Sequence, residues 1–239
     1  RQNNLWQTTD KLLLAVSGGI DSVVLCDLCR QAGYTFYIAH CNFKLRGQES
    51  ERDELFVTNL AAKYKVELFT KSFDTNDYAA LKKLSIQEAA RELRYTWFKE
   101  VVENLKLKTS QPVKLLTAHH ANDNIETLLM NFFKGTGIHG LQGIAPKSGD
   151  KNYLVRPLLF ASKEEIISFA TIHQLAFVED SSNASDKYTR NYFRNQLIPG
   201  LQKVYPQVAE NLTANITRFN EIEELYSQAI FQHKKNLLE

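Results

Sequence analysis

Short apolar runs alternate along this chain with longer segments in which apolar residues recur every three or four positions. The runs predict β-strands at 11–16, 35–40, 66–71, 113–118 and 153–156, and the segments between them predict helices. Strands that alternate with helices usually pair in parallel. We therefore expect an α/β fold with a parallel five-stranded sheet flanked by helices.

Helix starts and the chain's tail refine this picture. Ser85 with Glu88 forms a capping box before a helix predicted to about Asn104, and Ser162 with Glu165 forms a second. From Pro206 onward the helical spacing continues with no later glycine or proline to stop it. A helix of roughly 30 residues exceeds the usual globular length of about 8–20. We expect a catalytic domain at 1–204 and a long C-terminal connector helix at 205–239, leading to a domain absent from this chain.

Composition adds few constraints. The 239 residues are 44% hydrophobic and 23% charged, and their net charge of +2 means that any nucleic acid would bind a local patch. Three cysteines do not suggest a disulfide framework, which favours the cytoplasm, and no apolar stretch is long enough to span a membrane. Cys26 and Cys29 fall inside a predicted helix, where we expect small buried thiols.

The first candidate site follows the strand at 11–16 directly. Two serines and two glycines surround an isoleucine and an aspartate there: Ser17, Gly18, Gly19, Ile20, Asp21 and Ser22. A strand that turns through glycines into a helix points backbone N–H groups at one spot, which favours a phosphate. Asp21 needs a cation between itself and a phosphate, so it indicates Mg²⁺ on a triphosphate. The segment has neither the lysine of a Walker A sequence nor the spacing of a dinucleotide fingerprint.

A second set of polar residues stands where the strand at 113–118 ends and a helix begins. Asp123 and Glu126 share one face of that helix and could hold a cation or a substrate amine, although solvated surface carboxylates would show the same pattern. His119 and His120 could suggest a zinc site, but no further cysteine or histidine follows them at zinc-ligand spacing. We therefore expect His119 to hydrogen-bond to a phosphate or to the reacting base. The buried stripe of this helix is predicted to be Ile125, Leu128, Leu129, Phe132 and Phe133.

Basic and flexible segments complete the candidates. Arg190, Asn191 and Arg194 fall on one predicted helix, where arginines a turn apart can grip a phosphate backbone; an exposed basic face would look the same. Residues 40–47 follow the second strand and so lie at the edge where parallel sheets bind ligands. Close backbone approach or a moving lid is indicated by a cluster of glycines, Gly135, Gly137, Gly140 and Gly143.

Together these segments resemble the bacterial tRNA(Ile)-lysidine synthetases, a family of N-type ATP pyrophosphatases with a Rossmann-like PP-loop domain. The resemblance runs in unbroken order from about Lys11 to Pro199. The motifs that carry it are SGGIDS at 17–22, HCNFKLRGQES at 40–50, SIQEAARELRY at 85–95, AHHANDNIET at 118–127, GTGIHGLQGI at 135–144, RPLL at 156–159, EDSSN at 179–183 and TRNYFRNQLIP at 189–199.

The resemblance implies an ATP-dependent ligase that joins free lysine to C2 of the wobble cytidine in the CAU anticodon of an isoleucine tRNA. The reaction would pass through an adenylated cytidine and release AMP and pyrophosphate. Residues 17–22 would bind ATP, with Mg²⁺ held by Asp21 and Asp123, and Asp123, Glu126 and His119 would be catalytic. Contacts with tRNA would come from Arg190, Asn191 and Arg194. Formation of a homodimer is left open.

Three positions depart from the family pattern. Asn122 stands where an aspartate is usual, Phe43 where a second histidine is usual, and Lys44 where a glycine is usual. Two other readings remain. A PP-loop tRNA thiolase would activate the same kind of base oxygen but needs a reactive cysteine, for which Cys41 alone is at the ligand edge. A non-catalytic ATP-binding module would not need Asp21, Asp123 and Glu126.

Overall fold

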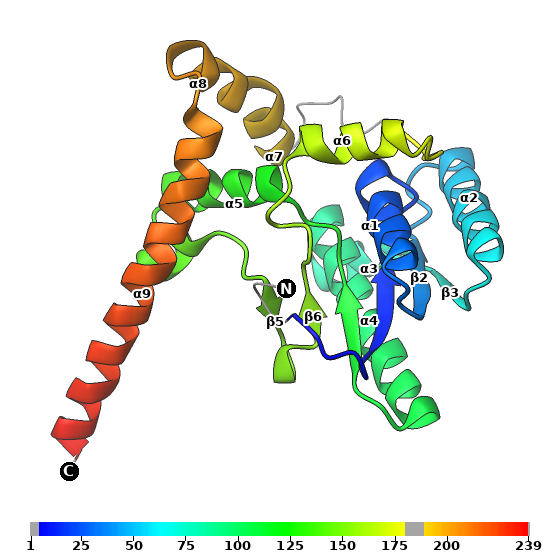
Figure 1. Cartoon of the computed structure of the whole chain (residues 1–239), viewed down its shortest axis with the longest axis horizontal. Helices are drawn as coiled ribbons and strands as arrows, with labels where there is room; N and C mark the ends of the chain where they lie inside the picture. Colours follow the sequence, from blue (N-terminus) through cyan, green and yellow to red (C-terminus); the bar gives the residue numbers. More distant parts are fainter. Residues whose placement is uncertain (1–4, 180–188, 239) are drawn as a thin grey trace. The chain divides into compact units, whose positions relative to one another are not determined.

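The computed structural model describes residues 5–179 and 189–238. Contacts within the chain divide it into two compact units. The first unit comprises residues 1–118, 146–158 and 164–179, and the second comprises residues 119–145, 159–163 and 180–239. Figure 1 traces both along the sequence, from blue to red.

A six-stranded sheet forms the centre of the first unit, in the order β3-β2-β1-β4-β6-β5 (Figure 1). Its strands are β1 (Lys11–Ala15), β2 (Phe36–Asn42), β3 (Leu68–Ser72), β4 (Val113–Leu116), β5 (Lys147–Ser148) and β6 (Leu154–Val155). All neighbours from β3 to β6 pair in parallel, so the five expected strands are confirmed. The additional strand, β5, pairs antiparallel with β6 and is too short to show an alternating pattern in the sequence.

Helices cover both faces of this sheet. They are α1 (Ile20–Gln31), α2 (Gln48–Tyr64), α3 (Thr75–Lys82), α4 (Ile86–Thr109) and α6 (Lys163–Ile172, in this unit from Glu164), with a 3₁₀ turn η2 (Asp150–Asn152). The capping box before α4 is confirmed: the Glu88 N–H donates to Ser85 Oγ (3.2 Å) and the Ser85 N–H donates to Glu88 Oε2 (3.0 Å). α4 continues to Thr109, beyond the predicted end, and Ser110 caps it in the left-handed conformation.

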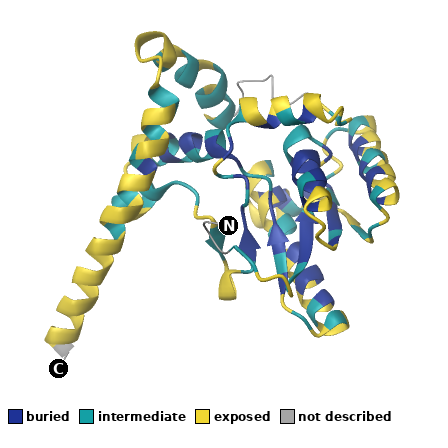
Figure 2. Ribbon diagram, viewed as in Figure 1, coloured by how far each residue is buried: buried dark blue, intermediate teal, exposed yellow. Residues whose placement is uncertain are grey.

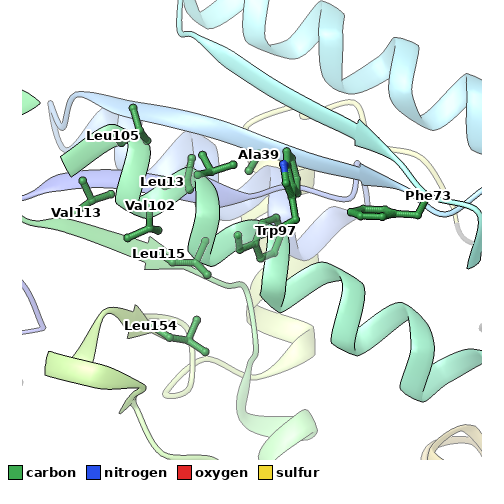
Figure 3. Close-up of a cluster of buried hydrophobic side chains, with 11 residues drawn as sticks. Leu13, Ala39, Phe73, Trp97, Val102, Leu105, Val113, Leu115 and Leu154 are labelled. Carbon is green, nitrogen blue, oxygen red and sulfur yellow. The ribbon is translucent and has the colours of Figure 1, made fainter. Parts of the chain in front are cut away.

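One core cluster of the first unit lies between the sheet and α4. Leu12, Leu13 and Leu14 of β1 are all 0% exposed, and because successive strand residues point to opposite faces, both faces of the sheet are covered. Figure 3 shows Leu13 and Leu115 of the strands beside side chains of α4, and Figure 2 shows the buried strands in dark blue. This rigid centre holds the carboxyl ends of the strands, where the candidate residues begin.

The second unit is helical over its described residues. Its elements are α5 (Ala121–Lys134), η1 (Ile138–Gln142), α7 (Thr189–Tyr192), the π-helical segment η4 (Phe193–Leu197), α8 (Ile198–Val204) and α9 (Val208–Leu238). α9 confirms the predicted long tail helix. It packs on α5 and η1, where Gln142 Nε2 donates to Asn220 Oδ1 (3.2 Å), while its second half is exposed (Figure 2).

Burial on α5 corrects part of one prediction. Ile125, Leu128 and Leu129 are buried as expected, but Phe132 and Phe133 are 61% and 63% exposed. The helix therefore buries its first turns and leaves the rings of its last turn in solvent. In α1 the expectation of small buried thiols is confirmed, since Cys26 and Cys29 are 0% and 4% exposed. Among the described residues no helix is both long and apolar enough to cross a membrane.

Candidate functional site

The first candidate site is the segment of residues 17–22, which we call the SGGIDS loop. It links the end of β1 to the start of α1, as the sequence predicts, and Gly19 is the N-cap of the helix in an extended conformation. Ser22 Oγ donates to the Gly19 carbonyl (2.8 Å), and the Gly19 N–H donates to Ser17 Oγ (3.3 Å). Because glycine has no side chain to cap α1, the first-turn N–H groups suit an external anion.

Gly18 is required by its surroundings in the first unit. Its φ of +94° is unfavourable for residues with a Cβ, and a Cβ there would lie 2.7 Å from Val178 Cγ2 and 3.3 Å from Phe56 Cδ1. The backbone is also tied, since the Val178 N–H donates to the Gly18 carbonyl (3.0 Å). Val178 and Phe56 therefore pack against the SGGIDS loop. The sequence did not predict this, because no local pattern signals a contact between residues so far apart in the chain.

His40 is a second supporting residue that the sequence left without a role. Its Nδ1 lies 2.8 Å from the carbonyl of Val16, the residue before the SGGIDS loop. A carbonyl only accepts, so Nδ1 carries the proton and Nε2 is the acceptor of the neutral ring. Burial lowers the pKa of His40 and keeps the ring neutral at physiological pH. His40 thus fastens the end of β2 to the chain entering the loop.

The second candidate site lies in the second unit and joins acids to arginines. Arg194 donates from Nε to Glu126 Oε1 (2.6 Å) and from Nη2 to Glu126 Oε2 (3.0 Å) and Asp123 Oδ1 (3.1 Å). Arg190 donates to Thr127 Oγ1 (2.9 Å), and its Nε is 3.6 Å from Glu126 Oε2. We call Asp123, Glu126, Arg190 and Arg194 the acid–arginine network. The sequence nominated all four, but not that they bind one another.

The pKa values of the two acids in this network are shifted in opposite directions. Burial raises the pKa of Glu126, whose side chain is fully covered, against the opposing effect of Arg194. Burial would also raise the pKa of Asp123, but the His120 ring and backbone N–H, with His119 and Arg194, lower it overall. Asp123 is therefore the firmly ionised member, and Glu126 depends on its arginines for its charge.

The remaining predicted residues occupy neighbouring positions. His119 precedes the N-cap of α5, His120, and Asn191 lies in α7; both are partly exposed. Asn122, where the family usually has an aspartate, accepts a hydrogen bond from the Lys163 N–H (2.9 Å), so it caps the start of α6. Residues 180–183 of the EDSSN motif lie outside the described residues.

A magnesium ion would have to share its ligands with the nucleotide. Within residues 5–179 and 189–238 no three His, Cys, Asp or Glu side chains are grouped to hold a metal. Asp21 stands in the first turn of α1, and Mg²⁺ on a nucleotide commonly takes one or two carboxylates with phosphates and water. This donor set fits Mg²⁺ carried by a triphosphate and does not fit a protein-only metal centre.

Comparisons with known proteins agree with this arrangement. Residues 1–201 match the PP-loop domain family, which implies ATP as the nucleotide. A tRNA(Ile)-lysidine synthase of Bacteroides thetaiotaomicron is 42% identical over 99% of this chain and 54% of the relative. One of Parabacteroides distasonis is 40% identical over 95% and 50%, and one of Chlorobaculum tepidum is 35% identical over 96% and 67%.

Among solved structures, the U34-tRNA thiolase NcsA of Methanococcus maripaludis has a TM-score of 0.68 at 16% identity, covering 92% of this chain and 76% of the thiolase. At that identity the likeness shows the fold alone. The chain spans about half the length of the first two curated relatives. On the sequence match and the shared fold, the chain belongs to the PP-loop domain family and, within it, to the tRNA(Ile)-lysidine synthases.

Proposed function

We propose that this chain ligates lysine to C2 of the wobble cytidine of a CAU-anticodon isoleucine tRNA, using ATP and giving lysidine, AMP and pyrophosphate. The observation that carries the proposal is the 42% identity to a tRNA(Ile)-lysidine synthase over 99% of this chain. The SGGIDS loop supports it, because it combines a helix N-terminus with a glycine whose surroundings exclude a side chain.

The chemistry needs an activated oxygen. The O2 atom of cytidine attacks the α-phosphorus of ATP, the bond to the β-phosphate oxygen breaks, and pyrophosphate leaves. The incoming lysine ammonium gives up a proton to solvent, and the resulting ε-amine attacks C2. The C2–O2 bond breaks, AMP leaves, and the attached nitrogen releases a second proton to solvent. Such transfer depends mostly on positioning and charge stabilisation, which Ser17, Ser22 and the N–H groups of the loop would supply.

Mg²⁺ would be held by Asp21 and Asp123 and would neutralise charge on the triphosphate. For Asp123 this means exchanging the hydrogen bond from Arg194, which occupies Oδ1. The lowered pKa of Asp123 makes its carboxylate a suitable partner for the incoming lysine ammonium. Glu126 would keep Arg194 in place, and His119 would hydrogen-bond to a phosphate or to the reacting base.

The wider organisation follows from the same proposal. Residues 1–204 would be the catalytic domain and residues 205–239, most of them in α9, a connector to a further domain. Arg190, Asn191 and Arg194 would contact tRNA, with both arginines releasing some of their present partners to do so. The enzyme would act in the cytoplasm, where tRNA and free lysine are available, and a homodimer stays a prediction.

The test uses the chain with ATP, Mg²⁺, radiolabelled lysine and, separately, the isoleucine and methionine tRNAs that share the CAU anticodon. We expect label in the isoleucine tRNA alone and one pyrophosphate released for each lysine incorporated. Pyrophosphate release without lysine incorporation would favour a different nucleophile. Absence of both, with ATP still bound, would favour a non-catalytic nucleotide-binding module.

A further inference from the structure

Three phenylalanines form an aromatic cluster on the second unit, and two of them are largely exposed. The rings of Phe132 and Phe133, at the end of α5, meet edge to face with centroids 5.6 Å apart. Phe193 of η4 adds its ring to Phe133 at 6.0 Å, so residues distant in sequence share one surface. We call Phe132, Phe133 and Phe193 the aromatic patch. Phe132 and Phe133 keep more than half of their surface in solvent, at 61% and 63% exposure.

Exposed aromatic groups of this kind are informative. A large apolar ring in solvent forgoes the stabilisation that burial would give, and contiguous exposed apolar surface commonly marks a binding site. Tyr192, the residue before Phe193, is also 52% exposed. The patch therefore presents exposed aromatic surface to a partner, and none of these residues has a part in the proposed chemistry.

Charge around the patch indicates which kind of partner it fits. The patch lies on two segments, 127–145 and 189–206, and neither contains an aspartate or a glutamate. The same segments carry four permanently basic residues: Lys134, Arg190, Arg194 and Lys203. Since the whole chain is nearly neutral, with a net charge of +2, this concentration is local. Two of the four, Arg190 and Arg194, bind Glu126 and Asp123 in this structure and would exchange these partners for phosphates. Aromatic rings close in sequence to basic residues are typical of surfaces that bind single-stranded nucleic acid.

We propose that the aromatic patch stacks unpaired nucleobases of the tRNA anticodon loop while the basic residues around it meet the phosphates. The inference rests on the proposed function and adds a binding surface to it. Loop bases are unstacked and offer their faces to aromatic side chains, whereas paired bases in a helix do not. The patch would thus hold bases beside the target cytidine and favour a loop over a duplex of the same charge.

The test measures the affinity of the chain for an RNA stem-loop with the CAU anticodon and for a fully paired duplex of equal length. Phe133→Ala should weaken stem-loop binding about tenfold, since a base stacked on an aromatic ring contributes about 1–3 kcal/mol. Binding of the duplex should be unchanged, and Phe133→Trp should retain stem-loop affinity. Phe231→Ala is the matched control, because Phe231 of α9 is 71% exposed but lies outside the two basic segments.

Several results would overturn the inference. Unchanged stem-loop affinity in a folded Phe133→Ala chain would do so, as would equal losses for stem-loop and duplex or an equal loss in Phe231→Ala. A change in oligomeric state without a change in RNA affinity would identify a protein interface instead. The two proposals fail separately: a wild-type chain that binds the stem-loop through Phe133 but makes no lysidine refutes the function alone. Lysidine formation with Phe133→Ala fully active and fully binding refutes the patch alone.

Discussion

Replacing Gly18 with alanine tests the reason for the glycine in the SGGIDS loop. The residue has a φ of +94°, and the added methyl group would lie 2.7 Å from Val178 Cγ2. Carbon atoms prefer separations of about 3.5–4.0 Å, so the contact is about 1 Å too short. The methyl group cannot move away from Val178 towards Phe56, because Phe56 Cδ1 would already lie only 3.3 Å from it. The substitution therefore combines backbone strain with steric overlap.

A second glycine separates these two effects. Gly33 also has a positive φ, +75°, but a Cβ there would have nothing within 4 Å. Backbone strain alone should cost Gly33→Ala about 1–2 kcal/mol. Gly18→Ala should lose about 2–5 kcal/mol, because overpacking adds about 1–3 kcal/mol to the same strain. The difference between the two variants measures the close approach of Val178 and Phe56.

Thermal unfolding and ATP titration calorimetry provide the assays. Gly18→Ala should melt several degrees below Gly33→Ala and should bind ATP at least about tenfold more weakly, because the displaced loop no longer aims its N–H groups at one point. Gly33→Ala should bind ATP like the wild type. The reasoning is refuted if the two variants have equal melting temperatures, or if Gly18→Ala binds ATP normally.

Two further predictions concern buried groups. Arg194→Ala should destabilise the chain by about 1–3 kcal/mol, less than the roughly 3–5 kcal/mol of a fully buried broken pair because Arg194 is 36% exposed. Burial already raises the pKa of Glu126, and removing Arg194 raises it further. The folded state of the variant therefore becomes less stable as the pH rises from the ordinary pKa of a glutamate through the raised pKa of Glu126. The loss of melting temperature should be larger at ~pH 8 than at ~pH 5, and equal losses would contradict this. Burial raises the pKa of the Cys41 thiol to about 12, so the thiol stays protonated and unreactive. Cys41→Ser should therefore retain lysine ligation, and iodoacetamide should alkylate the native thiol slowly. Abolished turnover in Cys41→Ser would favour sulfur transfer.

Much of the fold could be read from local patterns. The strand cores of β1, β2, β3, β4 and β6, the capping box at Ser85 and the long helix α9 all rest on residues close together in sequence. Their signals are periodicity and capping chemistry, which act over a few residues. Where an outcome depended on distant neighbours the sequence was less informative. Phe132 and Phe133 continue the apolar spacing of α5 and yet remain 61% and 63% exposed, because burial depends on which segments pack against a helix and not on its own spacing.

The candidate sites divide in the same way. The sequence alone determined which residues could carry phosphate, acid and arginine chemistry, because a glycine turn after a strand and charged residues at helical spacing are local features. Only the tertiary structure decided that Val178 and Phe56 close around Gly18, and that Arg194 binds both Asp123 and Glu126. Those contacts join residues separated by many tens of positions, where packing in three dimensions, and no local preference, determines which side chains meet.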